Sequence, residues 1–150
     1  MSTTIAAIRK TIRVEADPDH AFRVFTDGIG RWWPLDRYSI HEEDAETVVL
    51  EAREGGRLYE RSRTGAEAVW GEILECDPPR LLRYTWHPGY EEGAPVTEIE
   101  VRFEPEGNGT RVEFEHRGWE RLGDSAPEKQ RGYDEGWDDV LPRYAAATCS

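Results

Sequence analysis

The feature that most constrains the fold is the succession of short alternating segments between residues 46 and 118. Hydrophobic and polar residues alternate within each segment, and turn residues such as Gly55-Gly56, Asp77-Pro78-Pro79 and Gly107-Asn108-Gly109 separate them. A period of two is typical of strands with one buried face, and these turns suit antiparallel connections. We therefore expect six consecutive strands, over residues 46–53, 57–63, 67–76, 80–87, 96–104 and 110–118.

The segment before this run predicts one more strand and two short helices. Residues 5–15 alternate well enough for a strand, and Asp17-Pro18 then provides an N-cap followed by proline at the first helical position. A second short helical turn is expected over residues 29–33, before Pro34.

The C-terminal segment changes to a helical period. One apolar stripe combines residues at spacings i, i+4, i+7, i+8 and i+11, namely Tyr133, Trp137, Val140, Leu141 and Tyr144. Ser125 and Glu128 have the spacing of a capping box, which predicts where this helix begins. Gly132, Gly136 and Pro142 are poor helix formers, and they predict a bend or a close approach of another segment.

Length and charge restrict the classes of partner. The 150 residues fit one domain over residues 1–150, and the 19 basic and 31 acidic residues give a net charge of −12. Such a charge repels nucleic acid and anionic membranes, so neither is expected as a partner. Cys76 and Cys149 lack the spacing of a disulfide framework, and residues 1–14 do not resemble a signal peptide, which together predict a cytoplasmic location.

Cofactors are not expected either. His20, His41 and Asp44 do not form a metal-binding motif, and Gly28 and Gly30 lack the third glycine of a dinucleotide site. The loop of residues 88–95 is expected to form a mobile rim. Whether the protein forms a homodimer is left open.

Five short sequence motifs on these elements resemble those of one known family. They are Gly55-Gly56-Arg57-Leu58-Tyr59-Glu60, Trp70-Gly71-Glu72-Ile73-Leu74-Glu75, Asp77-Pro78-Pro79-Arg80-Leu81, Tyr84-Thr85-Trp86 and His116-Arg117-Gly118-Trp119. In this order they resemble the branch of the START-like (SRPBCC) superfamily named for the activator of heat-shock-protein ATPase, which is grouped with polyketide cyclase-like proteins. The resemblance implies an α+β helix-grip fold, with a curved antiparallel sheet of about seven strands. It also implies a long C-terminal helix across that sheet, with a cavity between the two.

Aromatic residues are the expected lining of such a cavity. The chain has six tryptophans, and an indole offers a wide apolar face together with one N–H donor. The candidate ligand-binding residues are Trp32, Trp33, Tyr59, Trp70, Trp86, Phe103, Phe114, His116, Tyr133, Trp137 and Leu141.

The alternation of side chains between the two faces of a strand refines this set of candidates. Phe103, Phe114 and His116 lie on the apolar face of their strands, and Phe103, Phe114, Trp137 and Leu141 are expected to line a common interior space. Trp86 is favoured for the interior over Trp70, because Trp70 is expected on the same face of its strand as Glu72. For Tyr133 and Trp137 on the C-terminal helix, packing in the core is as good an interpretation as lining a cavity.

The adjacent Trp32 and Trp33 are expected to divide their roles. Neighbouring helical residues do not face the same side, so one is expected to pack in the core while the other lies at the mouth of the cavity. The sequence leaves open which of the two faces inward.

Two residues are candidates for catalysis, and in both cases the non-catalytic interpretation is favoured. His116 is an imidazole on an apolar face, but a hydrogen-bonded core histidine is the commoner outcome. Glu60 shares its strand parity with Leu58, yet a solvent-exposed carboxylate is favoured over a buried one.

Three functions remain, in order of preference. The first is binding of a small hydrophobic or aromatic molecule, and the second is a polyketide cyclase-like or hydrolase-like enzyme that uses the same cavity. The third is a chaperone-cofactor-like interaction protein, which predicts a filled core and an exposed apolar patch.

Overall fold

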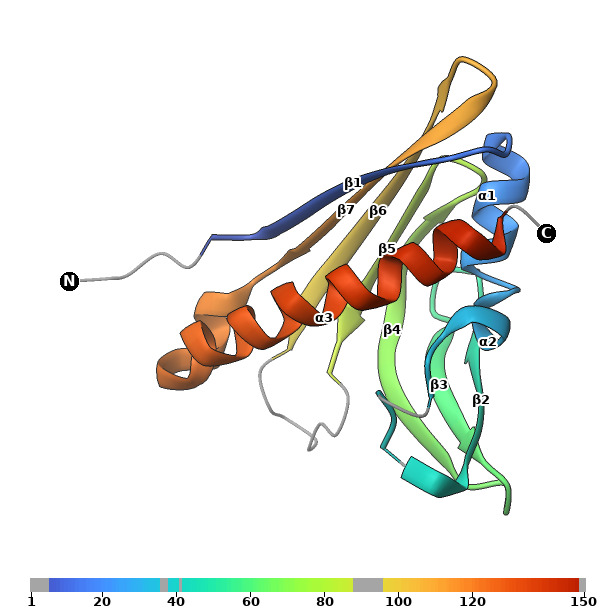
Figure 1. Ribbon diagram of the computed structural model, residues 1–150. Helices are drawn as coiled ribbons and strands as arrows, with labels where there is room; N and C mark the ends of the chain where they lie inside the picture. The colour runs from blue at the N-terminus through green and yellow to red at the C-terminus, as the bar shows by residue number, and fades with distance from the viewer. Residues whose placement is uncertain (1–5, 36–37, 41, 88–95, 149–150) are drawn as a thin grey trace.

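The computed structural model describes residues 6–35, 38–40, 42–87 and 96–148. Seven antiparallel strands form one sheet in the order β1-β7-β6-β5-β4-β3-β2, and the long helix α3 crosses it (Figure 1). The strands are β1 (Ile8–Val14), β2 (Ala45–Leu50), β3 (Arg57–Ser62), β4 (Glu67–Asp77), β5 (Leu81–Trp86), β6 (Thr97–Glu106) and β7 (Gly109–Arg117). The helix-grip fold expected from the sequence is confirmed.

Two short helices, α1 (Pro18–Phe25) and α2 (Ile29–Trp32), follow β1 as predicted. Asp17 caps α1, because its Oδ1 accepts a hydrogen bond from the backbone N–H of His20 at 2.9 Å. The 3-10 turn η1 (Glu42–Asp44) precedes β2, and η2 (Trp119–Ser125) connects β7 to α3 (Ala126–Ala147).

The capping box predicted for α3 is wrong. The Ser125 hydroxyl donates backward to the carbonyl of Leu122 at 3.1 Å and caps no N–H of the helix. The reason is that η2 leads into α3 directly, so Ser125 itself has helical backbone angles. The helix is continuous through Pro142.

Helix α3 is attached to the first strand by polar contacts at its middle and to α1 by a contact near its C-terminal end. Lys10 of β1 forms ion pairs with Asp134 at 2.6 Å and with Asp138 at 3.0 Å. Toward the C-terminus, the Tyr144 hydroxyl donates to the carbonyl of Ala21 in α1 at 2.8 Å. The helix is thereby held across the concave side of the sheet, where its apolar stripe is buried.

The outer face of the sheet carries cross-strand ion pairs, as the alternation predicted. Arg117 lies 2.7 Å from Glu98, 3.2 Å from Glu100 and 2.8 Å from Glu115. The intervening side chains of β6 and β7, such as Val101, are buried on the inner face. Because this outer face is charged, the apolar groups that could form a site lie on the α3 side.

In β4, the prediction of which face of the strand each side chain occupies is wrong at one position. Trp70, expected to share a face with Glu72, is 1% exposed, whereas Glu72 is exposed. The pairing of β3 with β4 shifts register between Leu58 and Tyr59, so Trp70 lies in a bulge that turns its side chain inward. Both Trp70 and Trp86 are therefore in the interior.

Candidate functional site

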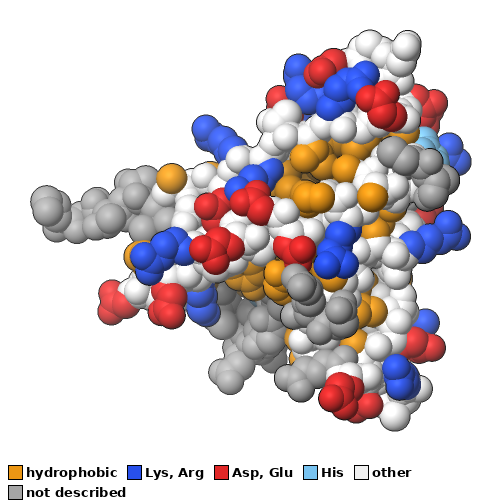
Figure 2. Space-filling view, viewed as in Figure 1, with side chains coloured by type: hydrophobic (Ala, Val, Ile, Leu, Met, Phe, Trp, Pro, Cys, Tyr) orange, Lys and Arg blue, Asp and Glu red, His pale blue; other side chains and the backbone are white. Residues whose placement is uncertain are grey.

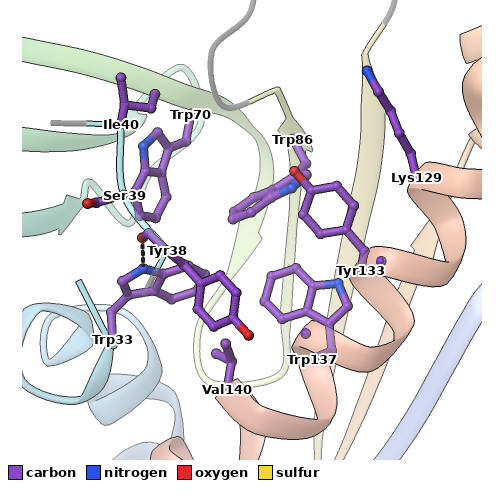
Figure 3. A pocket seen from close by; sticks show the side chains of 12 residues that line it. Trp33, Tyr38, Ser39, Ile40, Trp70, Trp86, Lys129, Tyr133, Trp137 and Val140 are labelled. Atoms are coloured by element: carbon purple, nitrogen blue, oxygen red, sulfur yellow. Dashed lines mark hydrogen bonds between the residues drawn. The ribbon is translucent and has the colours of Figure 1, made fainter. Parts of the chain in front are cut away.

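A cavity of about 430 Å³ lies between α3, the strands β4 and β5, and the segment that follows α2 (Figure 3). This volume is within the range of about 300–1,000 Å³ that is usual for small-molecule sites. Its lining residues are Trp33, Tyr38, Ser39, Ile40, Trp70, Trp86, Lys129, Gly132, Tyr133, Gly136, Trp137 and Val140. Hydrophobic side chains gather along the lower edge of α3 in the space-filling view (Figure 2).

The walls of the cavity are aromatic rings in mutual contact. The ring of Trp70 lies 5.0 Å from Trp33 and 5.6 Å from Trp86, and Trp86 lies 5.2 Å from Trp137, measured between centroids. The rings are tilted or perpendicular to one another, which is the favoured geometry of aromatic pairs. Edges and faces of four indoles therefore surround one apolar space.

The expected division of roles between Trp32 and Trp33 is only partly right, because both side chains are buried. Helix α2 ends at Trp32, and the extended backbone of Trp33 turns its ring away from the helix. Trp32 packs against Phe25 and Tyr144 in the core, while Trp33 lines the cavity.

Glu60 is buried, so the solvent-exposed interpretation is wrong. Its side chain is 0% exposed, and Oε1 accepts hydrogen bonds from Trp70 Nε1 at 2.9 Å and from the backbone N–H of Ile40. Buried carboxylates require such donors, which explains why this position tolerates a charge-bearing residue. Glu60 thus positions one wall of the cavity and the segment at its mouth.

His116 is fully buried behind the cavity, in a chain of hydrogen bonds. Trp137 Nε1 donates to His116 Nδ1 at 3.1 Å, so the proton of the neutral ring is on Nε2, which donates to Thr97 Oγ1 at 2.7 Å. The Thr97 hydroxyl donates onward to the carbonyl of Trp86 at 3.1 Å. Burial lowers the pKa of His116 to about 3, so the ring is neutral at physiological pH.

The polar groups that reach the cavity are few. The Tyr38 hydroxyl lies 3.4 Å from Asp139 Oδ2, and Trp33 Nε1 donates to the Tyr38 carbonyl at 2.8 Å. Burial raises the pKa of Tyr133, so its phenol keeps its proton at neutral pH. Lys129 is exposed and, among the described residues that line the cavity, is the one with a basic or acidic side chain. Such a cavity is suited to an apolar ring system with a few oxygen atoms.

Five of the predicted ligand-binding residues line the cavity, and six do not. The five are Trp33, Trp70, Trp86, Tyr133 and Trp137, and the six are Trp32, Tyr59, Phe103, Phe114, His116 and Leu141.

Packing explains where the remaining candidates lie. Phe103 is covered by Phe22 and Phe25 of α1, at 5.2 and 5.8 Å between ring centroids. Trp137 lies against Phe114 at 4.8 Å and faces the cavity in its place. Tyr59 lies under the Arg57 guanidinium, outside the core cluster. The common interior space expected for Phe103, Phe114, Trp137 and Leu141 is therefore packed core, and only Trp137 borders the cavity.

Sequence reasoning missed several lining residues. Lys129, Gly132 and Gly136 lie on the same face of α3 as Tyr133 and Val140, so extending the apolar stripe to its non-apolar neighbours would have found them. The residues Tyr38, Ser39 and Ile40 belong to an irregular segment, which has no period from which an orientation follows.

The described residues offer neither a metal site nor a helix that could span a membrane. Within residues 6–35, 38–40, 42–87 and 96–148, no group of three His, Cys, Asp or Glu side chains is placed to hold a metal ion. None of the described helices is long and apolar enough to span a membrane. His41, Cys149 and residues 88–95 lie outside the part of the chain that the structure describes.

The sheet, the crossing helix and the aromatic cavity together define a helix-grip protein. The chain belongs to the family described as activator of Hsp90 ATPase homolog 1-like protein, whose model matches residues 15–147. No curated protein matches the chain.

Solved structures place the chain among related folds. An anthrahydroquino-γ-pyrone synthase, Txn09, solved as a complex with SUM, is 37% identical over 89% of this chain and 90% of its own, with a TM-score of 0.59. CalC of Micromonospora echinospora, a self-sacrificing resistance protein, is 28% identical over 95% and 93%, with a TM-score of 0.73. The Aha1 dimer of Colwellia psychrerythraea, at 20% identity over 96% of both chains and a TM-score of 0.68, shows the fold alone.

Proposed function

We propose that this protein binds a small planar aromatic molecule in the cavity between α3 and the sheet. The observation that carries the proposal is the ring of four indoles, Trp33, Trp70, Trp86 and Trp137, around an open volume of about 430 Å³. A core of this size has no need to leave such a volume empty, since protein interiors pack to the density of organic crystals. Flat aromatic rings complement these walls by dispersion and by release of water.

A substitution on α3 tests the proposal without disturbing the walls. A Cβ atom on Gly136 would meet the Tyr38 hydroxyl oxygen at 3.9 Å, which is ordinary contact, and because Gly136 lines the cavity we expect the side chain of Gly136→Leu to extend into it. Leucine is also a better helix former than glycine by about 0.5–1 kcal/mol. We expect Gly136→Leu to keep or raise the melting temperature and to abolish binding.

The measurement is quenching of tryptophan fluorescence by anthraquinone-2-sulfonate, with Ala146→Leu as the matched control. Ala146 is an exposed residue near the end of α3 and does not line the cavity, so its variant should bind as the wild type does. Saturable quenching that is lost only in Gly136→Leu supports the proposal. A flat titration of the folded wild type, or unchanged binding by Gly136→Leu, contradicts it.

A second candidate function is ring closure of an aromatic substrate held in the same cavity. The likeness to the synthase Txn09, at 37% identity over 89% of this chain, favours it. The same variants serve as the test, with an ortho-hydroxyaryl 1,3-diketone as probe, which closes to an aryl-fused γ-pyrone with loss of one water. Faster closure with the wild type than with Gly136→Leu supports an enzyme. Binding of the diketone without faster closure supports a carrier.

The third hypothesis, a chaperone-cofactor-like protein, receives less support. It requires a filled core and an exposed apolar patch. Of the large hydrophobic side chains exposed in the described residues, Tyr38 and Ile40 line the cavity, and only Val69 and Leu74 lie elsewhere, on β4. The single domain, the cytoplasmic location and the homodimer that the sequence left open stay proposals.

A further inference from the structure

The indole N–H groups of the six tryptophans differ in whether they have a hydrogen-bond acceptor within the protein. Five indole N–H groups have an acceptor within the protein: Val24 O for Trp32, Tyr38 O for Trp33, Glu60 Oε1 for Trp70, His116 O for Trp119 and His116 Nδ1 for Trp137. Trp86 Nε1 is buried, and among the residues that the structure describes it makes no hydrogen bond of normal geometry; only the Tyr133 hydroxyl comes close enough to interact with it. Because a buried N–H without a partner is rare and unfavourable, this group calls for an explanation.

The position of Trp86 supplies the explanation. Its ring is 5% exposed and lines the cavity, so, as far as the described residues show, an acceptor can reach the N–H from the cavity side or from Tyr133. The Tyr133 ring is nearly perpendicular to it, at 83° and 6.1 Å between centroids, and the Tyr133 hydroxyl interacts with the Trp86 N–H (Figure 3). Two donors, one N–H and one O–H, therefore converge on one place in an otherwise apolar wall.

We propose that Trp86 Nε1–H and the Tyr133 O–H together hold an oxygen acceptor of the ligand, a ring carbonyl or a phenolate. This inference rests on the proposed function and narrows it to oxygenated planar aromatics such as quinones. An indole nitrogen donates only, so the atom that it meets is an acceptor. If Trp86 donates to the Tyr133 oxygen, the phenolic proton is still available for the ligand.

Two further features fit an electron-rich oxygen. Burial raises the pKa of Tyr133, so the hydroxyl stays a donor at neutral pH. Lys129, one turn before Tyr133 on α3, places a positive charge at the rim of a protein whose net charge is −12. The charge of Lys129 at the rim thus favours a partly anionic ligand.

The experiment compares two probes that share one ring frame, anthraquinone-2-sulfonate and anthracene-2-sulfonate. Only the first has carbonyl oxygens, and the sulfonate interacts with Lys129 equally in both. We expect the wild type to bind the quinone more tightly. Tyr133→Phe, which removes one hydroxyl, should weaken quinone binding by about tenfold and change anthracene binding by less than about twofold.

Tyr59→Phe is the matched control, because Tyr59 lies outside the core cluster and does not line the cavity. It should change neither affinity. Trp86→Phe removes ring area that both probes contact, so it should weaken the binding of both. The ratio of the quinone affinity to the anthracene affinity then reports the contribution of the indole N–H. We expect this ratio to fall toward one.

The outcomes separate this inference from the function on which it rests. If Tyr133→Phe weakens both probes equally, or neither, the paired-donor site is overturned while aromatic binding stands. If the folded wild type binds neither probe, both the proposed function and this inference fail.

Discussion

At the scale of single residues, His116 explains how a polar group is accommodated in an apolar core. Both ring nitrogens have partners, Trp137 Nε1 and Thr97 Oγ1, and the ring contacts Trp119 at 4.2 Å between centroids. The sequence favoured a structural histidine because no neighbouring nucleophile or carboxylate was evident. The structure supplies the reason in the hydrogen bonds, since both nitrogens are occupied by the protein and neither lines the cavity.

The burial of His116 predicts a loss of stability in mild acid. Its folded-state pKa of about 3 lies below its unfolded value of about 6.5, so the unfolded chain binds more protons as the pH falls below 6.5. The free energy of unfolding should therefore decrease by about 1.4 kcal/mol between pH 8 and pH 5.5 through this group.

His116→Gln tests this prediction in urea denaturation at several pH values. We expect the variant to lose about 1–3 kcal/mol at pH 8, where a buried partner is left without its hydrogen bond, and to show a flatter decrease toward pH 5.5. His87 contributes to the remaining slope, because burial also lowers its pKa. An unchanged slope in His116→Gln would refute the assignment.

At the scale of elements, periodicity predicted what is regular and missed what interrupts it. All seven strands and the three α-helices lie within a few residues of their expected positions, because alternation and helical stripes are local properties. The bulge at Trp70 is not local, since it depends on how β3 and β5 pair with β4. A one-residue shift in strand register moves each side chain to the opposite face of the sheet, which is why the orientation of Trp70 could not be predicted.

Gly71 accompanies this bulge and allows a close approach of β5. A Cβ atom at Gly71 would lie 1.8 Å from the backbone oxygen of Thr85, so Gly71→Ala forces the two strands apart. We expect a loss of about 3 kcal/mol in the free energy of unfolding, measured by urea denaturation. Gly132→Ala is the matched control, because a Cβ there meets no atom within 4 Å, and it should be neutral or slightly stabilising. Equal effects of the two variants would contradict the close approach.

At the scale of the whole molecule, the cavity is assembled from segments that are far apart in the chain. Trp33 follows α2, Trp70 and Trp86 belong to β4 and β5, and Trp137 belongs to α3. The resemblance to the family predicted a cavity between sheet and helix, and the stripe of α3 predicted Tyr133 and Trp137. Which end of the groove stays open depends on α1, whose Phe22 and Phe25 fill the space over Phe103. That outcome of long-range packing is not evident in any local pattern.

Trp137 connects the core, the buried histidine and the cavity, so its removal should affect both stability and binding. Its ring packs against Phe114, its N–H donates to His116, and another part of the ring lines the cavity. We expect Trp137→Ala to lower the free energy of unfolding by about 3 kcal/mol, the lower end for a buried tryptophan, because the cavity already borders the ring.

Affinity for anthraquinone-2-sulfonate should fall in the same variant by more than about tenfold, because Trp137 is one of the four indole walls. Calorimetric melting and fluorescence titration measure the two effects independently. Val101→Ala is a useful control, since Val101 is fully buried in β6 but does not line the cavity, so it should lower stability and leave affinity unchanged. A Trp137→Ala variant that melts far lower yet binds the probe as tightly as the wild type would show that Trp137 belongs to the core alone, and the α3 wall of the proposed site would have to be withdrawn.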